Sequence, residues 1–286
     1  MRKMLCLSAM LLCAGGMMVM AGAEPLLLEQ ATNTLKPKTL EVGISELSYQ
    51  SDQVTITDAN GAETLKITNT VTSLPLYLKY AFTGDIEGLL QLSNNSVTSK
   101  SEAGGASLSS DSSGMGDPVA GVKFALSKGD IQWGAGAMLS LPMGDKKYRE
   151  GLTTAPFVAA RRELGVLSLN AQLSYALTGE YDDDASQQKV NPGDELGLGA
   201  GIEYIVPQNK ALSLIGEVSY QSFGESSVAG TAVKSSEGAR MDINLGMRYQ
   251  AGNVKTLLGV VVATGEEKYR EYDYRVLAGV TYLLQL

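Results

Sequence analysis

The side chains available for chemistry in this chain are carboxylates, amines, amides and hydroxyls, because its 286 residues include no histidine. Without an imidazole there is no Ser-His-Asp or Cys-His relay and no histidine-ligated zinc site. An enzyme would have to run its acid–base steps with Asp, Glu, Lys or Tyr. The two cysteines, Cys6 and Cys13, fall in a leader that we expect to be removed. The sequence therefore predicts a protein that is not an enzyme, with no metal site and no cofactor.

The charged and amide side chains recur at every second position, between apolar neighbours. We predict that eleven of them line a pore: Lys79, Lys123, Asn170, Gln172, Glu203, Glu217, Arg240, Asp242, Arg248, Lys255 and Arg275. Glu203 and Glu217 are expected to form a cross-strand charge ladder with Arg248 and Lys255. Two interpretations stay open: a constriction that selects small solutes by charge, or neutralising pairs that simply allow a polar interior.

Strands must position these side chains, because the alternation has a period of two. Between Leu167 and Thr178, Leu, Ala and Tyr residues alternate with Ser, Asn and Gln, and 195–206 and 240–249 repeat the pattern. A period of two over ten or more residues is typical of strands. After residue 23 no run approaches the roughly 20 apolar residues of a transmembrane helix. The pattern indicates a barrel with apolar residues toward lipid and polar residues toward the lumen.

The fold class expected is all-β, a transmembrane antiparallel β-barrel of about twelve strands in an up-and-down meander. The longer connections are predicted to be polar loops at 100–116, 143–154, 179–194 and 224–238, which alternate with tight turns. A barrel of eight strands has an interior filled by side chains, and a barrel of sixteen strands has an open aqueous pore. The interior of a twelve-stranded barrel is expected to be intermediate in width. The predicted strands are 40–57, 63–82, 87–99, 117–127, 131–142, 155–164, 166–178, 195–206, 211–223, 239–250, 254–265 and 271–286.

Three regions divide the chain. Residues 1–23 have the basic start, apolar stretch and small residues of a signal peptide; an uncleaved anchor and a lipidated Cys13 are the alternatives. Residues 24–39 are expected to be a periplasmic N-terminal segment, either a short amphipathic helix that plugs the lumen or an unstructured leader. Residues 40–286 form the predicted barrel.

Two details of the alternation give finer predictions. Tyrosines near both strand ends are expected to form aromatic girdles. Their positions are Tyr80, Tyr204, Tyr249 and Tyr282 at the short turns and Tyr175, Tyr220, Tyr272 and Tyr274 at the loops. In the first strand Val42 and Ile44 are out of phase with Leu47 and Tyr49, which predicts a β-bulge.

Charge and location limit the partners. Without Arg2 and Lys3 the chain keeps 21 basic against 31 acidic residues, a net charge of −10, which argues against nucleic acid. The expected partners are outer-membrane lipid, lipopolysaccharide, a small-molecule solute and the barrel-assembly machinery, which recognises an apolar last strand. The oligomeric state stays open.

Two glycine-rich motifs carry a family resemblance. The runs Gly114–Phe124 (GMGDPVAGVKF) and Leu141–Asp145 (LPMGD), with 173–179 (LSYALTG) after them, resemble the outer-membrane family named after the meta pathway of phenol degradation. The resemblance spans roughly residues 110 to 286. It implies a channel or transporter associated with the uptake of aromatic or other hydrophobic compounds.

We therefore predict a bacterial outer-membrane channel or transporter for small molecules, with hydrophobic or aromatic compounds as the solute class that the resemblance suggests. The alternative is a non-transporting structural or surface-interaction barrel.

Overall fold

The computed structural model describes residues 35–57, 63–103, 106–128, 130–148, 151–183, 188–233, 236–265 and 272–286. The predicted signal peptide and residues 24–34 of the predicted periplasmic N-terminal segment lie outside the described residues. Within the described part of the chain, no helix is long and apolar enough to cross a membrane.

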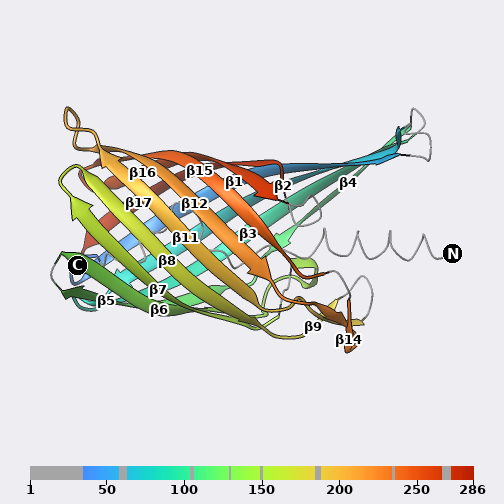
Figure 1. Ribbon diagram of the computed structural model, residues 1–286, viewed down its shortest axis with the longest axis horizontal. Helices are drawn as coiled ribbons and strands as arrows, with labels where there is room; N and C mark the ends of the chain where they lie inside the picture. Colours follow the sequence, from blue (N-terminus) through green and yellow to red (C-terminus); the bar gives the residue numbers. More distant parts are fainter. Residues whose placement is uncertain are drawn as a thin grey trace.

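Twelve antiparallel strands close into a barrel, which confirms the predicted fold (Figure 1). One of the twelve is in two pieces, because β4 and β5 both pair with β3. The strands are β1 (Thr39–Thr57), β2 (Glu63–Ala81), β3 (Ile86–Ala103), β4 (Ala106–Met115), β5 (Val119–Lys128), β6 (Ile131–Ser140), β7 (Thr153–Leu164), β8 (Leu167–Thr178), β11 (Glu195–Ile205), β12 (Leu212–Phe223), β15 (Gly238–Ala251), β16 (Val254–Gly265) and β17 (Tyr274–Gln285).

The first and last strands form the closing seam. Strand β1 pairs with β17 from Thr39 opposite Gln285 to Ser51 opposite Tyr274, and the register shifts after Ile44. The pairing of β1 with β2 shifts at the same place. This confirms the predicted bulge, which lets Leu47 and Tyr49 face outward although their spacing from Ile44 breaks the alternation.

Beyond the barrel wall, β1 to β4 continue as a projecting sheet (Figure 1). Strands β3 and β4 stay paired from Asn94 opposite Met115 to Ala103 opposite Ala106. The prediction of a loop at 100–116 is therefore wrong for most of these residues, which are in strands β3 and β4. Both faces of this hairpin meet water, so its Ser-rich sequence has no apolar face to mark it as strand.

The other predicted loops contain short elements. Strands β9 (Tyr181–Asp183), β10 (Gln188–Asn191), β13 (Ser227–Val228) and β14 (Thr231–Ala232) pair as a small separate sheet at the loop end. The connection after β6 contains the 3-10 turn η2 (Lys146–Tyr148).

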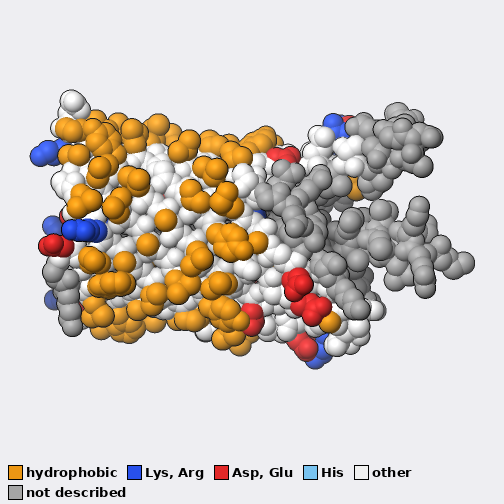
Figure 2. All heavy atoms as spheres, in the orientation of Figure 1, with side chains coloured by type: hydrophobic (Ala, Val, Ile, Leu, Met, Phe, Trp, Pro, Cys, Tyr) orange, Lys and Arg blue, Asp and Glu red, His pale blue; other side chains and the backbone are white. Residues whose placement is uncertain are grey.

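Apolar side chains cover the outside of the barrel, and charged side chains gather at its two ends (Figure 2). Leu76 is 49% exposed and Leu245 66%, which in water would be a large unfavourable surface but suits lipid. Six predicted girdle tyrosines are exposed on this surface: Tyr175, Tyr204, Tyr220, Tyr249, Tyr274 and Tyr282. Tyr80 is half-buried. The prediction for Tyr272 was wrong: it precedes the first residue of β17 and lies fully buried inside.

Candidate pore-lining site

The structure places the eleven candidate side chains on the polar side of their strands, opposite the apolar outer surface. Seven are buried and the other four are half-buried. The buried ones are Lys79, Lys123, Asn170, Glu203, Glu217, Arg240 and Asp242, and the half-buried ones are Gln172, Arg248, Lys255 and Arg275. Strand alternation explains this placement, because each candidate stands two residues from another inward position.

A cluster of five charged side chains lies at the short-turn end, and we call it the turn-end cluster: Glu41, Lys79, Glu87, Lys123 and Lys255. The Glu87 carboxylate lies 3.0 Å from Lys123 Nζ and 3.8 Å from Lys79 Nζ. Glu41, with 0% of its surface exposed, lies 3.1 Å from Lys255 Nζ and 4.0 Å from Lys79 Nζ, and accepts a hydrogen bond from Thr281 Oγ1 at 2.7 Å.

The sequence missed both carboxylates of this cluster. Glu87 could have been found, since it keeps the inward alternation of its strand and stands opposite Lys123. Glu41 was hidden by the bulge that follows it. Its bond to Lys255 also corrects the predicted ladder, which placed Lys255 beside Glu203 and Glu217.

A second cluster crosses the middle strands. Arg248 Nη2 lies 2.6 Å from Glu203 Oε1, and Arg161 Nη1 lies 3.3 Å from Glu203 Oε2. Arg161 also donates to Ser168 Oγ at 2.8 Å. The sequence left open whether Arg161 or Arg162 faces inward; Arg161 is 4% exposed, whereas Arg162 faces out. The predicted pairing of Glu203 with Arg248 is therefore seen, but Glu217 takes no part in it.

A third cluster combines cations with aromatic rings at the loop end. The Arg240 guanidinium lies over the rings of Phe223 and Tyr272, at 5.7 and 5.5 Å from their centroids. Arg275 lies over the Tyr272 ring at 4.9 Å. The Tyr272 hydroxyl donates to Asp242 Oδ2 at 3.0 Å, and Arg240 Nε lies 3.4 Å from the same oxygen. These cation–π and ionic contacts fix the positive side chains against the wall.

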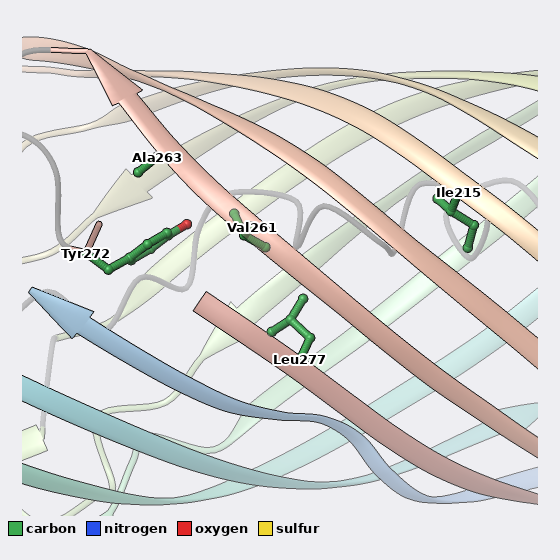
Figure 3. Packing of buried hydrophobic residues seen from close by; sticks show 5 residues of the cluster. All are labelled: Ile215, Val261, Ala263, Tyr272 and Leu277. Carbon is green, nitrogen blue, oxygen red and sulfur yellow. The ribbon is translucent and has the colours of Figure 1, made fainter. Parts of the chain in front are cut away.

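One part of the inner wall is apolar, which the strict polar-in prediction did not foresee. Ile215, Val261, Ala263, Tyr272 and Leu277 form a buried cluster on β12, β16 and the start of β17, and we call it the apolar wall patch (Figure 3). Val261 and Leu277 have no exposed surface. Ile215 and Ala263 keep 7% and 4% of their surface exposed, and these side chains can contact the apolar body of a solute.

The described start of the chain also reaches the inner wall. The backbone N–H of Leu35 donates to Glu87 Oε2 at 2.9 Å. At the opposite terminus, the Leu286 N–H donates to the carbonyl of Lys38 at 2.9 Å. Residues 35–38 thus connect the turn-end cluster with the end of the last strand.

Comparison with known proteins gives the family. A family model described as "Putative MetA-pathway of phenol degradation" matches residues 36–275. The chain belongs to this family. No curated protein matches the chain. The COG4313 outer membrane channel from Pseudomonas putida F1 is similar in structure, with a TM-score of 0.65 at 18% identity over 88% of this chain and 98% of that one. The NanC porin matches with a TM-score of 0.50 at 7% identity, over 86% and 99% of the two chains. At these identities the likeness shows the fold, an outer-membrane barrel.

The structure explains why the phenol-degradation family motifs contain glycine beside aspartate. Asp117 Oδ1 accepts the N–H of Gly144 at 2.7 Å, and Asp145 Oδ2 accepts the N–H of Met115 at 2.7 Å. A Cβ on Gly144 would lie 2.7 Å from the Gly116 carbonyl carbon, which leaves room only for glycine. The two motifs bind each other and hold the loop after β6 against the break between β4 and β5.

Proposed function

We propose that the chain is a channel of the bacterial outer membrane, exported by cleavage after residue 23, and that small molecules pass along its lumen. The observation that carries the proposal is the inner wall. Ionised side chains follow one another from the turn-end cluster to the Arg240 cluster, while the outer surface of the same strands is apolar. A polar, charged inner wall beneath an apolar outer surface is typical of barrels with a water-filled lumen.

The eleven candidate residues are the proposed lining of this path. Reconstitution of the purified barrel in planar lipid bilayers should give discrete conductance steps. Arg275→Gln should shift the reversal potential in a salt gradient toward cations, because it removes a positive charge from the wall. Lys210→Gln, in an exposed short turn, is the matched control and should leave the potential unchanged. A folded barrel that is silent across voltages and salts would refute the proposal.

We propose amphipathic aromatic compounds as the solute class. The support is the apolar wall patch beside the ring-stacked Arg240 and Arg275, because such a wall offers contacts to both an apolar ring and a polar group. Liposome swelling in phenylalanine should be faster than in glutamine, which has a similar size and the same zwitterionic backbone. Equal swelling rates would be compatible with a channel but would refute aromatic compounds as its solute class.

A second candidate function rests on the projecting sheet of β1 to β4. Among the described residues, strand β4 pairs only with β3, and it is exposed along most of its length. An open strand edge can bind an extended segment of another chain. Removal of residues 96–113 should abolish a surface interaction and spare conductance; the opposite outcome would assign the sheet to transport.

Lipid, lipopolysaccharide and the barrel-assembly machinery are the proposed partners of the outer surface. The exposed apolar side chains support contact with lipid. The support for the barrel-assembly machinery is the apolar outer face of β17, where Val280, Tyr282 and Leu284 are exposed and resemble the signal that it recognises.

A further inference from the structure

One carboxylate of the inner wall has no cationic partner in the described part of the chain. Glu41, Glu87, Glu203 and Asp242 each contact a lysine or an arginine. Glu217 is 6% exposed, and its Oε2 has no hydrogen-bond partner among the described residues. A buried carboxylate is unfavourable unless something donates to it.

The neighbours of Glu217 add more unpartnered acceptors. Asn244 stands directly opposite on β15, is fully buried, and has no hydrogen bond from either amide atom within the described residues. On the other side Glu217 faces Gly201, and Gly201 faces Asn170 on β8. The Oδ1 atom of Asn170 also lacks a partner in the described chain.

Gly201 makes room for the Glu217 side chain. A Cβ at position 201 would lie 2.7 Å from Glu217 Cγ, so the side chain of Glu217 lies over the glycine. This directs the Glu217 side chain toward β8 and Asn170. Carboxylate and amide oxygens of Glu217, Asn170 and Asn244 thus stand in one cross-strand row.

The apolar wall patch adjoins this row. Val261 is the cross-strand partner of Asn244, and Ile215 is two residues before Glu217 on the same face. In the next row Ile215 and Leu277 are separated by Gly246 and Gly259, which carry no side chains.

The ligand that fits this chemistry has a positive donor on an apolar body. We propose that Glu217 and Asn170 bind the ammonium group of a small organic amine, whose apolar part packs beside Ile215. This rests on the proposed function, because the amine would enter through the lumen. An anion would be repelled by Glu217, and a neutral alcohol would gain hydrogen bonds without charge.

The cations of the wall do not replace the ligand. Arg248 is held by Glu203 at 2.6 Å. Arg275 is separated from Glu217 by Asn244 and Val261 in the cross-strand row, which at about 4.8 Å per strand is about 14 Å.

Direct binding tests the site without transport. Titration calorimetry of the full-length protein in detergent micelles should show benzylammonium binding at least about ten times tighter than benzyl alcohol, and no binding of benzoate. Glu217→Gln keeps the shape and removes the charge, so it should weaken benzylammonium about tenfold or more and still fold. Glu225→Gln, the same change at an exposed loop position, should have no effect. Equal affinity for amine and alcohol, or an unchanged Glu217→Gln variant, overturns the proposal.

Gly201→Ala is the second variant. Its Cβ would displace the Glu217 side chain while every charge stays, so benzylammonium should bind several-fold more weakly. Unchanged binding in this variant would contradict the geometry of the row.

Conductance separates this proposal from the channel function. In planar bilayers benzylammonium should reduce the current of the wild type and not that of Glu217→Gln. A conducting barrel indifferent to benzylammonium would overturn the amine site and keep the channel. A barrel that binds the amine through Glu217 but never conducts would keep the site and overturn the channel.

Discussion

Gly43 is the residue whose replacement should most directly open the barrel. It lies in β1 beside the bulge, opposite Thr281 of the closing strand β17. A Cβ at this position would lie 2.7 Å from Thr281 Cα and still closer to the Val280 carbonyl oxygen. Both obstacles are backbone atoms, which cannot rotate away. Gly43→Ala must therefore push the first strand from the last.

The size of the effect follows from this distance. Restoring an ordinary contact of about 3.5 Å requires the strands to separate by about 0.8 Å or more. A hydrogen bond near 2.9 Å would then exceed 3.5 Å and be lost. If two seam hydrogen bonds break, with their N–H and C=O groups left without partners, the loss is about 2 to 5 kcal/mol. At a urea slope of about 2 kcal/mol per molar, the unfolding midpoint falls by about 1 to 2.5 M.

The assay is urea unfolding of the barrel in lipid vesicles, followed by the gel shift between folded and unfolded chains. Gly216→Ala is the matched control, since its nearest neighbour would be the Leu245 side chain at 3.8 Å, an ordinary contact. Its midpoint should stay at the wild-type value. If Gly43→Ala had the same urea midpoint as Gly216→Ala, the stability of the seam would not depend on this close approach, and the reasoning would be refuted.

Three further changes test the wall, the outer surface and the motifs. Glu203→Gln removes the carboxylate that Arg161 and Arg248 share and should cost about 3 to 5 kcal/mol in the same unfolding assay, with a smaller loss for an exposed Glu→Gln change. Leu245→Arg places a charge among lipid tails and should cost about 2 to 4 kcal/mol, whereas Ser109→Arg in the projecting sheet should cost almost nothing. Asp117→Ala removes the acceptor of the Gly144 N–H, so the loop after β6 should exchange its amide hydrogens faster, with about 1 to 3 kcal/mol lost locally.

The sequence predicted most of the barrel because lipid and lumen impose opposite demands on neighbouring residues. The predicted strand 166–178 matches β8 (Leu167–Thr178) to within one residue. The signal disappears where this contrast ends. Ser107 to Ser113 of β4 have water on both sides, and Tyr272 precedes its strand, so alternation says nothing about either.

The partners of the inner charges were harder to predict than their direction. Lys255 reaches Glu41, which is 214 positions away along the chain and on the far side of β17. That contact depends on how the barrel closes and on the bulge in β1. Glu203 and Arg248 lie on strands separated by β12 alone, so the alternation pattern was sufficient to predict that they pair.

In the proposed channel, the composition of the inner wall would limit which solutes pass. A purely apolar molecule would gain contacts at Ile215 and Ala263, but it would have to displace water from the ion pairs of the turn-end cluster without replacing a hydrogen bond. A purely polar solute would lose hydrogen bonds to water at the apolar wall patch and gain none there. A molecule with an apolar body and one charged group satisfies both regions. Among the inner-wall carboxylates that the structure describes, Glu217 has no lysine or arginine partner, whereas Asp242 beside Tyr272 contacts Arg240. This is why an ammonium group is the solute feature to test first.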